Sequence, residues 1–175
     1  EALRQELDKM SADGSKGAYR IASKMMFMGH WLKHAGMYPV YQVRFGLRER
    51  LRFRQVGHGP QESLPPEELG SLREPLVHEA VSKGVADWIS RHNRYSSDEA
   101  NACMAAAGAV PWGDLVSADP VTRRRALKRA SGRLPCRPLA RFVYMWLLRG
   151  GFLDGVAGWR YCRLMAWYEY MITLK

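Results

Sequence analysis

The chain has 175 residues, of which 47% are hydrophobic and 25% charged, and its formal net charge at pH 7 is +10. This length and hydrophobic content support one domain with a buried core and exclude a wholly disordered chain. The positive charge predicts a polyanionic partner, for which a phosphate-rich membrane, a nucleotide-linked substrate and nucleic acid are the candidates.

The first half of the chain predicts a helix followed by a small antiparallel sheet. Residues 1–10 place Leu3, Leu7 and Met10 on one helical face. Alternation predicts strands over residues 18–22, 38–45 and 51–56, and a turn at 46–50 would pair the last two as a hairpin. The two prolines at 65 and 66 mark a loop or short helix start, and residues 75–78 form a further extended piece.

The second half predicts helices. One spans residues 82–93, and a capping box from Ser96 to Glu99 opens a separate helix over 98–107. After an irregular linker at 108–117, Asp119 caps a basic helix that includes residues 122–133. The aromatic run at 138–175 then forms two helical pieces separated by Arg149-Gly150-Gly151.

The aromatic run leaves two interpretations open. Its longest uncharged apolar stretch, residues 142–148, is far too short for a membrane span of roughly 20 residues. The two pieces are either buried core helices or interfacial helices with apolar rings inward and guanidinium groups toward anionic headgroups. In the second interpretation the membrane contacts are Arg141, Trp146, Arg149, Trp159, Arg163 and Trp167.

The basic helix before this run favours a membrane over nucleic acid. Two weak attractions add when a basic segment adjoins an aromatic amphipathic one. Nucleic-acid binding would need stacking aromatics among the charges, and residues 122–133 contain none. A solvated surface face is the simpler alternative for this helix.

The cysteines indicate the redox environment of the protein, and the first residues indicate how the chain begins. Cys103, Cys136 and Cys162 are odd in number and far apart, which argues against a disulfide framework or a zinc site and favours a reducing, cytosolic environment. The first residues contain neither an initial Met nor the apolar core of a signal peptide, so we expect the chain to be a piece of a longer protein.

His58 is the residue most typical of a site. It lies between two glycines directly after a predicted strand, with Gln61 and Glu62 downstream, where backbone can approach a ligand closely. A plain turn is the alternative. The sequence has no Gly-rich phosphate loop, GxSxG, HExxH or DxD motif, so these residues alone do not establish an enzyme.

Several strings, in order, resemble the C-terminal half of bacterial family 2 glycosyltransferases that build lipopolysaccharide core or exopolysaccharide. The resemblance covers nearly the whole chain, and its specificity lies in the order and spacing of the strings. They are AYRI at 18–21, FMGHWLKH at 27–34, YPVYQVR at 38–44, VGHG at 56–59, LREPLVH at 72–78, KGVADW at 83–88 with HNRYS at 92–96, PLARF at 138–142 and RGGFLDG at 149–155.

The resemblance implies a GT-A fold, a nucleotide-sugar donor, a divalent metal (Mg or Mn) held by an Asp-rich motif, and a lipid-linked acceptor at the cytoplasmic membrane face. It also implies that the nucleotide-binding half and the metal motif precede the matched region. The expected fold is therefore α+β, a short antiparallel sheet or hairpin followed by a mainly helical C-terminal half. Residues 1–80 would form the acceptor side of the catalytic domain and residues 81–175 a helical membrane-associating region.

Two departures from the family pattern affect the expected chemistry. Val40 stands where the family often has an Asp, and GHGP replaces its Val-His-Glu string, with Glu62 displaced. The resemblance implies that Gln42 and Arg44 bind acceptor or diphosphate, that His58 touches the metal-diphosphate, and that Glu62 is a fallback general base.

The sequence thus leads to two hypotheses. In the first, the chain is the acceptor-side and membrane-binding portion of a family 2 glycosyltransferase, peripheral at the inner face of the bacterial plasma membrane and inactive alone. Its partners would be a nucleotide-sugar donor, a lipid-linked acceptor and an anionic membrane surface, with no nucleic acid. In the second, it is a non-enzymatic basic helical adaptor that binds anionic membrane or nucleic acid.

Overall fold

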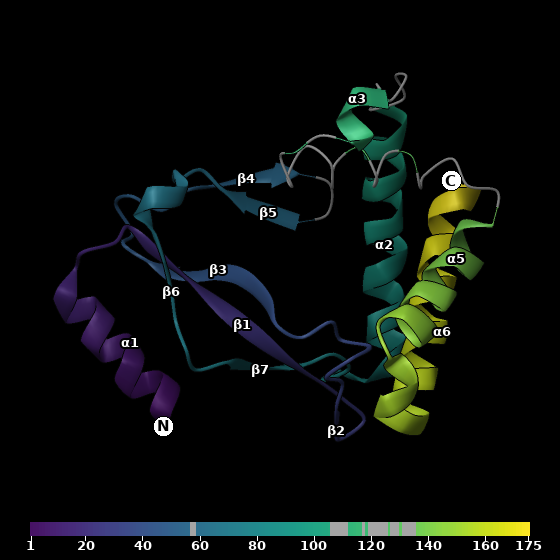
Figure 1. The fold of residues 1–175 in the computed structure, drawn as a ribbon, viewed down its shortest axis with the longest axis horizontal. Coiled ribbons are helices and arrows are strands. Elements are labelled where there is room, and N and C mark those ends of the chain that lie inside the picture. Colours follow the sequence, from purple (N-terminus) through teal and green to yellow (C-terminus); the bar gives the residue numbers. More distant parts are fainter. Residues whose placement is uncertain (57–58, 106–111, 117, 119–125, 127–129, 131–135) are drawn as a thin grey trace.

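A small sheet lies between one N-terminal helix and a group of C-terminal helices (Figure 1). The computed structural model describes residues 1–56, 59–105, 112–116, 118, 126, 130 and 136–175. The predicted basic helix, including its cap at Asp119, falls almost wholly outside the described residues. The α+β class, with a small sheet and C-terminal helices, is confirmed.

The N-terminal helix α1 (Ala2–Asp13) is held to the sheet by the apolar face that the sequence predicts. Leu3, Leu7 and Met10 pack against a buried cluster that contains Tyr19 and Ile21. The helix ends at Gly14, whose left-handed φ of 58° lets its N–H reach the Met10 carbonyl at 3.2 Å.

The central strand of the sheet is β1 (Ala18–Phe27), which continues five residues beyond the predicted strand. It pairs antiparallel with β2 (His30–Trp31) and β3 (Val40–Gly46), and parallel with β6 (Leu69–Ser71) and β7 (Leu76–Glu79). Ser23 pairs with both Val40 and Leu76, so β3 and β7 lie on opposite edges of β1. The sheet is therefore mixed, and the prediction of an antiparallel sheet is wrong on this point.

The predicted hairpin between residues 38–45 and 51–56 is also wrong. Strand β3 pairs with β1, whereas β4 (Phe53–Val56) pairs with β5 (Gly59–Glu62) in a separate two-stranded ribbon. Alternation identified the strands but not their partners, because pairing depends on contacts distant in sequence. Only two residues separate Val56 from Gly59, the loop length typical of a tight hairpin. A short 3-10 helix η1 (Pro66–Glu68) follows, at the predicted prolines.

A single helix, α2 (Gly84–Ala105), replaces the two helices predicted over 82–107. The predicted capping box is not a helix start, because Ser96 is buried in mid-helix and its hydroxyl donates to the Asn93 carbonyl at 2.7 Å. The helix continues because Trp88 and Ala100 pack in one cluster with Tyr168 and Ile172 of the last helix. The short α3 (Trp112–Leu115) follows.

The aromatic run forms the two helical pieces that the glycines predict. The first consists of α5 (Arg137–Val143), extended by the π-helical turn η2 (Tyr144–Leu148), and the second is α6 (Gly155–Leu174). Between them lie Gly150, with a positive φ of 71°, and the 3-10 helix η3 (Gly151–Asp154). Helices α5 and α6 pack side by side (Figure 1).

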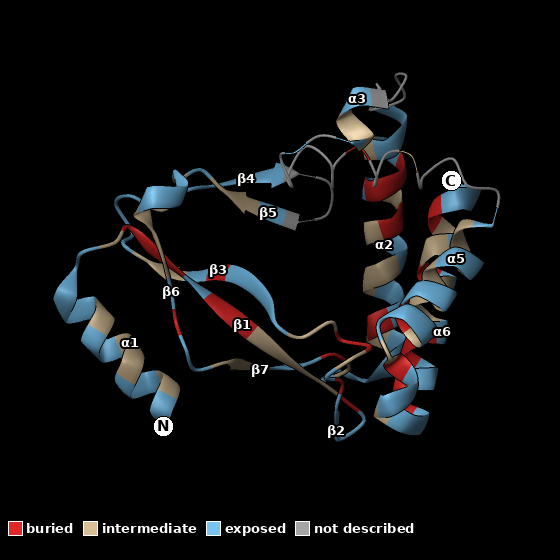
Figure 2. Cartoon of the chain, in the orientation of Figure 1, coloured by how far each residue is buried: buried red, intermediate tan, exposed pale blue. Residues whose placement is uncertain are grey.

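A buried cluster connects the sheet to these helices. Phe27 and Leu32 pack with Met145, Tyr161 and Cys162. Figure 2 shows buried residues along β1 and within the group of C-terminal helices, while α1 and the described residues of the β4–β5 ribbon are intermediate or exposed. The cluster has members on both sides of the predicted boundary between residues 80 and 81, which stays a prediction.

Candidate functional site

A cavity of about 260 Å³ lies between the main sheet and the β4–β5 ribbon. Residues from four strands line it, from β1 and β3 of the main sheet and from β4 and β5 of the ribbon. Figure 1 shows how these strands are arranged. The sequence-predicted residues Gln42, Arg44 and Glu62 all line this cavity, although they come from two separate sheets. Tertiary structure therefore brings together three of the four residues predicted for substrate binding and catalysis.

The side chains of the cavity combine two cations with one carboxylate. Arg20 and Arg44 are exposed at its wall, and Glu62 is half-buried. The Arg44 guanidinium donates to the side-chain oxygen of Gln42, which orients both groups along β3. Within the described part of the chain, Arg20 and Glu62 form no ion pair, so both keep charge available for a ligand.

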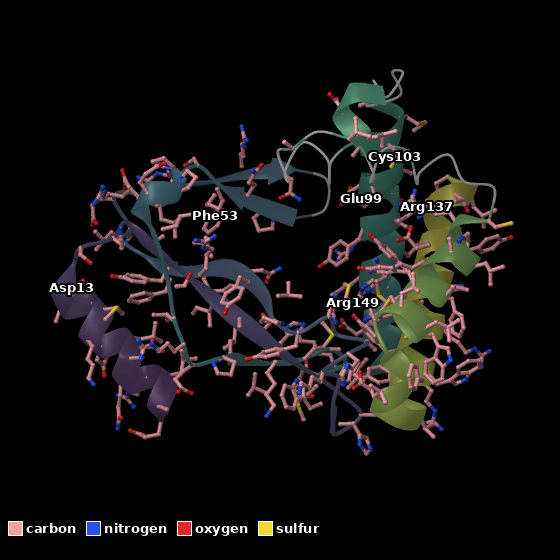
Figure 3. All side chains as sticks on the ribbon, in the orientation of Figure 1. Asp13, Phe53, Glu99, Cys103, Arg137 and Arg149 are labelled. Atoms are coloured by element: carbon pink, nitrogen blue, oxygen red, sulfur yellow. The ribbon has the colours of Figure 1, made fainter. Side chains whose placement is uncertain are left out.

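Two exposed aromatic rings complete the cavity. Tyr41 of β3 is 50% exposed and Phe53 of β4 is 51% exposed, an unusual exposure for rings that line a hollow. Figure 3 labels Phe53 on the ribbon above β3. The cavity thus combines flat apolar ring faces with guanidinium hydrogen-bond donors.

Positive charge from the cavity also acts on a neighbouring strand. Burial, followed by the positive charges of Arg44 and Arg91, lowers the pKa of His78 from its ordinary value. His78 therefore tends to be neutral, so that it does not add to the positive charge contributed by Arg44.

Sequence reasoning missed Arg20, Tyr41 and Phe53. The signal for Arg20 was a single charged residue within the apolar string Ala18-Tyr19-Arg20-Ile21-Ala22, where alternation should have assigned it to the open face of the sheet. The position of Tyr41 and Phe53 in one cavity could not be predicted, because it depends on how the β4–β5 ribbon lies against the main sheet. His58 lies outside the described residues, and its roles toward substrate and metal stay predictions.

The predicted membrane contacts divide into four locations. Trp146 and Trp159 belong to an aromatic cluster with Phe142 and Phe152, in which the Trp146 and Trp159 ring centroids are 5.1 Å apart. Arg149 is exposed at the end of η2, where Figure 3 labels it.

The other predicted contacts lie on α6 and on the inner side of α5. Arg163 and Trp167 line a groove between α6, the start of α2 and the turn after β1. Arg141 lines an inner cavity of about 330 Å³ together with Arg137, and both arginines lie near the Glu169 carboxylate, at 4.0 and 2.6 Å respectively. The structure thus brings Arg163 and Trp167 together and places Arg141 apart from them.

The acidic residue of the RGGFLDG string has a structural role. The Asp154 carboxylate accepts hydrogen bonds from the backbone N–H of His34 at 3.0 Å and of Ala35 at 2.7 Å. These bonds anchor the segment after β2 to the start of α6. Asp154 therefore joins two strings of the resemblance, FMGHWLKH and RGGFLDG, in one contact.

The described residues contain neither a membrane-spanning helix nor a cluster of metal ligands. Among them, no helix has the length and apolarity needed to cross a bilayer. Nor do any three His, Cys, Asp or Glu side chains of this part of the chain gather in a way that could hold a metal ion.

Comparison with protein-family models and with solved structures identifies no relative of this chain. No protein-family model matches the chain, and no solved structure matches it.

Proposed function

We propose that this chain is the acceptor-side and membrane-associating portion of a family 2 glycosyltransferase. The enzyme would transfer a sugar from a nucleotide-sugar donor to a lipid-linked acceptor in cell-envelope polysaccharide biosynthesis, at the inner face of the bacterial plasma membrane. The observation that carries the proposal is the convergence of Gln42, Arg44 and Glu62 on one cavity. The ordered strings of the resemblance support the same reading.

The cavity has groups for each part of such a transfer. The Glu62 carboxylate would take the proton of the acceptor hydroxyl as its oxygen bonds to the anomeric carbon of the donor sugar. The bond from that carbon to the diphosphate breaks, and the nucleoside diphosphate leaves with the electron pair. Arg20 and Arg44 would attract the negative charge of the diphosphate, while Tyr41 and Phe53 pack against sugar rings.

The aromatic cluster and the exposed arginines support the membrane part of the proposal. Residues 136–175 contain two carboxylates, Asp154 and Glu169, and both are engaged inside the protein. The outer surface of this segment therefore presents arginine charge together with exposed aromatic rings. This combination is typical of proteins that lie on an anionic bilayer.

The first test of this function is the genomic sequence upstream of the codon for Glu1. An in-frame βαβ segment with an Asp-rich motif upstream of Glu1 supports the enzyme, whereas a start codon close to Glu1 supports the non-enzymatic adaptor. The protein from that frame is then assayed with a panel of labelled nucleotide sugars and a bacterial lipid extract. Absence of transfer from every donor would overturn the proposal.

Glu62→Gln is the decisive variant in that assay. We expect it to lower kcat by at least about 100-fold, because a positioned general base typically contributes that factor. Glu49→Gln is the matched control, since Glu49 is exposed in the turn before β4 and does not line the cavity. An unchanged transfer rate in the Glu62 variant would show that Glu62 is not the general base. Transfer by the 175-residue chain alone would contradict the expectation that it is inactive without a nucleotide-binding half.

A further inference from the structure

A second hollow, separate from the cavity that contains Glu62, lies along α6. This groove has a volume of about 410 Å³ and is bounded by α6, the first turn of α2 and the turn between β1 and β2. The residues that matter here are Met28, Val85, Arg160, Arg163 and Trp167. None of them lines the cavity that contains Glu62.

Two arginines give the groove its charge. Arg160 and Arg163 are three residues apart on α6, so their side chains project from the same side of the helix. Both are exposed, and neither pairs with a carboxylate among the described residues. The one polar contact of Arg160 there is with the Met28 sulfur at 3.8 Å, and Arg163 lies 6.0 Å from the centroid of the Trp159 ring. Their hydrogen-bond donors are directed to no anion of this part of the protein.

The walls of the groove are apolar and exposed. Met28 is 50% exposed, Val85 40% and Trp167 37%. Met28 also has a φ of +51°, a left-handed conformation that disfavours a residue with a side chain. A glycine would fit this turn with less strain, so Met28→Gly can remove the exposed thioether without disturbing the backbone.

Further exposed apolar side chains lie on α6 before the two arginines and in the segment that precedes the helix. Val156 and Trp159, 66% and 39% exposed, precede Arg160 on α6, and the Trp159 ring centroid lies 6.0 Å from the Arg163 guanidinium. Leu148, Phe152 and Leu153, of the segment that precedes α6, are 76%, 49% and 63% exposed. A ligand with one negative group and long apolar chains would match the arginines and these apolar side chains at the same time.

We propose that the groove binds the headgroup of an anionic phospholipid. Arg160 and Arg163 donate to the phosphate oxygens, and Met28, Val85 and Trp167 contact the glycerol end of the acyl chains. Guanidinium groups suit phosphate because several N–H donors lie in one plane. The proposal rests on the membrane association in the proposed function and specifies the lipid, but it does not depend on sugar transfer.

Vesicle flotation tests the proposal. The probes are vesicles of phosphatidylcholine alone and of phosphatidylcholine with one-third phosphatidylglycerol, at physiological salt. We expect binding to the mixed vesicles, and the double variant Arg160→Gln/Arg163→Gln should bind them about 30-fold more weakly, since each arginine near an anionic surface contributes roughly fivefold. Equal binding of the unmodified protein to both kinds of vesicle would overturn the proposal.

A control variant with the same change in net charge distinguishes binding at the groove from general electrostatic attraction between the protein and anionic vesicles. Arg4→Gln/Lys9→Gln also removes two positive charges, but from exposed positions on α1 at the other end of the molecule (Figure 1). Its affinity should stay within about twofold, because salt screens charges beyond roughly 8 Å. An equal loss in the control and the double variant would show diffuse attraction and overturn the site.

Two further vesicle-binding measurements identify the ligand and test the role of Met28. Inorganic phosphate, matched with sodium chloride for ionic strength, should not displace the vesicles, and displacement would assign the groove to a soluble phosphate instead. Met28→Gly suits the positive φ and should keep the melting temperature while it weakens binding about fivefold through lost apolar contact. Unchanged vesicle binding by this variant would overturn the assigned lipid contact.

Discussion

Single side chains in the C-terminal segment have roles that their chemistry alone does not reveal. Asp154 and Glu169 are acidic residues in a basic segment, yet each is engaged internally, with backbone N–H groups or with Arg137. Cys162 is fully buried beside Tyr161, whereas Cys103 and Cys136 are exposed. Burial, with the Asp154 carboxylate as a second cause, raises the pKa of the Cys162 thiol to about 11.

Thiol reactivity should therefore divide the three cysteines. We expect Cys103 and Cys136 to react with Ellman's reagent within minutes at pH 8, because they are exposed. Cys162 should react only on unfolding, since it is buried and its thiolate is disfavoured. In Cys162→Ala, native and denatured protein should give the same count of two thiols. Three fast thiols in the native unmodified protein would contradict the burial of Cys162.

At the scale of elements, the turn between α5 and α6 depends on close backbone approach. A Cβ added at Gly158 would lie 2.3 Å from the Gly151 carbonyl oxygen and 2.8 Å from the Asp154 Cβ. The first turn of α6 therefore packs directly on η3, and this packing positions the Asp154 carboxylate against the segment after β2.

Gly158→Ala should destabilise the protein, although alanine is the better helix former. The added methyl group clashes with backbone, and overpacking of this kind costs about 2 kcal/mol. The measurement is the urea midpoint of unfolding. Gly113→Ala is the control, because no atom lies within 4 Å of its added Cβ, and it should be neutral or slightly stabilising. Equal midpoints for the two variants would refute the close approach.

At the scale of the whole molecule, the two ends carry different cavities and one buried cluster joins them. The sheet and its ribbon form the cavity with Glu62, and α6 carries the groove with Arg160 and Arg163. Phe27 packs edge-on against Tyr161 with centroids 5.6 Å apart, between the sheet and α6. Burial raises the pKa of Tyr161 to about 12 and also raises the pKa of Tyr168.

These shifts predict that stability falls at alkaline pH. The folded protein holds the protons of Cys162 and Tyr161 up to pKa values of about 11 and 12, whereas the unfolded chain loses them near the ordinary values of 9.0 and 10.0. The free energy of unfolding is therefore highest below pH 9 and decreases between about pH 9 and 12, by up to about 3 kcal/mol for the tyrosine. Urea unfolding across this range, by circular dichroism and by tryptophan fluorescence, measures the slope.

Tyr161→Phe provides the matched comparison for that slope, because it keeps the ring against Phe27 and removes the titrating group. The variant should lose less stability between pH 10 and 12. A slope identical to that of the unmodified protein would show that Tyr161 does not contribute to it. Because the buried cluster contains residues of both the sheet and the C-terminal helices, we expect circular dichroism and tryptophan fluorescence to report the same unfolding midpoint.

Local patterns determined several features of this protein. The spacing of Leu3, Leu7 and Met10 predicted α1 and its buried face, and alternation located the strands at residues 18–22 and 38–45. The glycines at 150 and 151 predicted the break between the last helical pieces. The resemblance, rather than a local pattern, pointed to Gln42, Arg44 and Glu62, which line one cavity.

Tertiary structure decided what depends on contacts far apart in the sequence. Periodicity reports which face of a strand is apolar but not which strand it pairs with, so the parallel pairing of β6 and β7 with β1 could not be predicted. The same limit applies to α2, where packing against α6 overrode a local capping signal at Ser96. It applies equally to Arg20, Tyr41 and Phe53, because a cavity wall exists only once the ribbon is placed against the sheet.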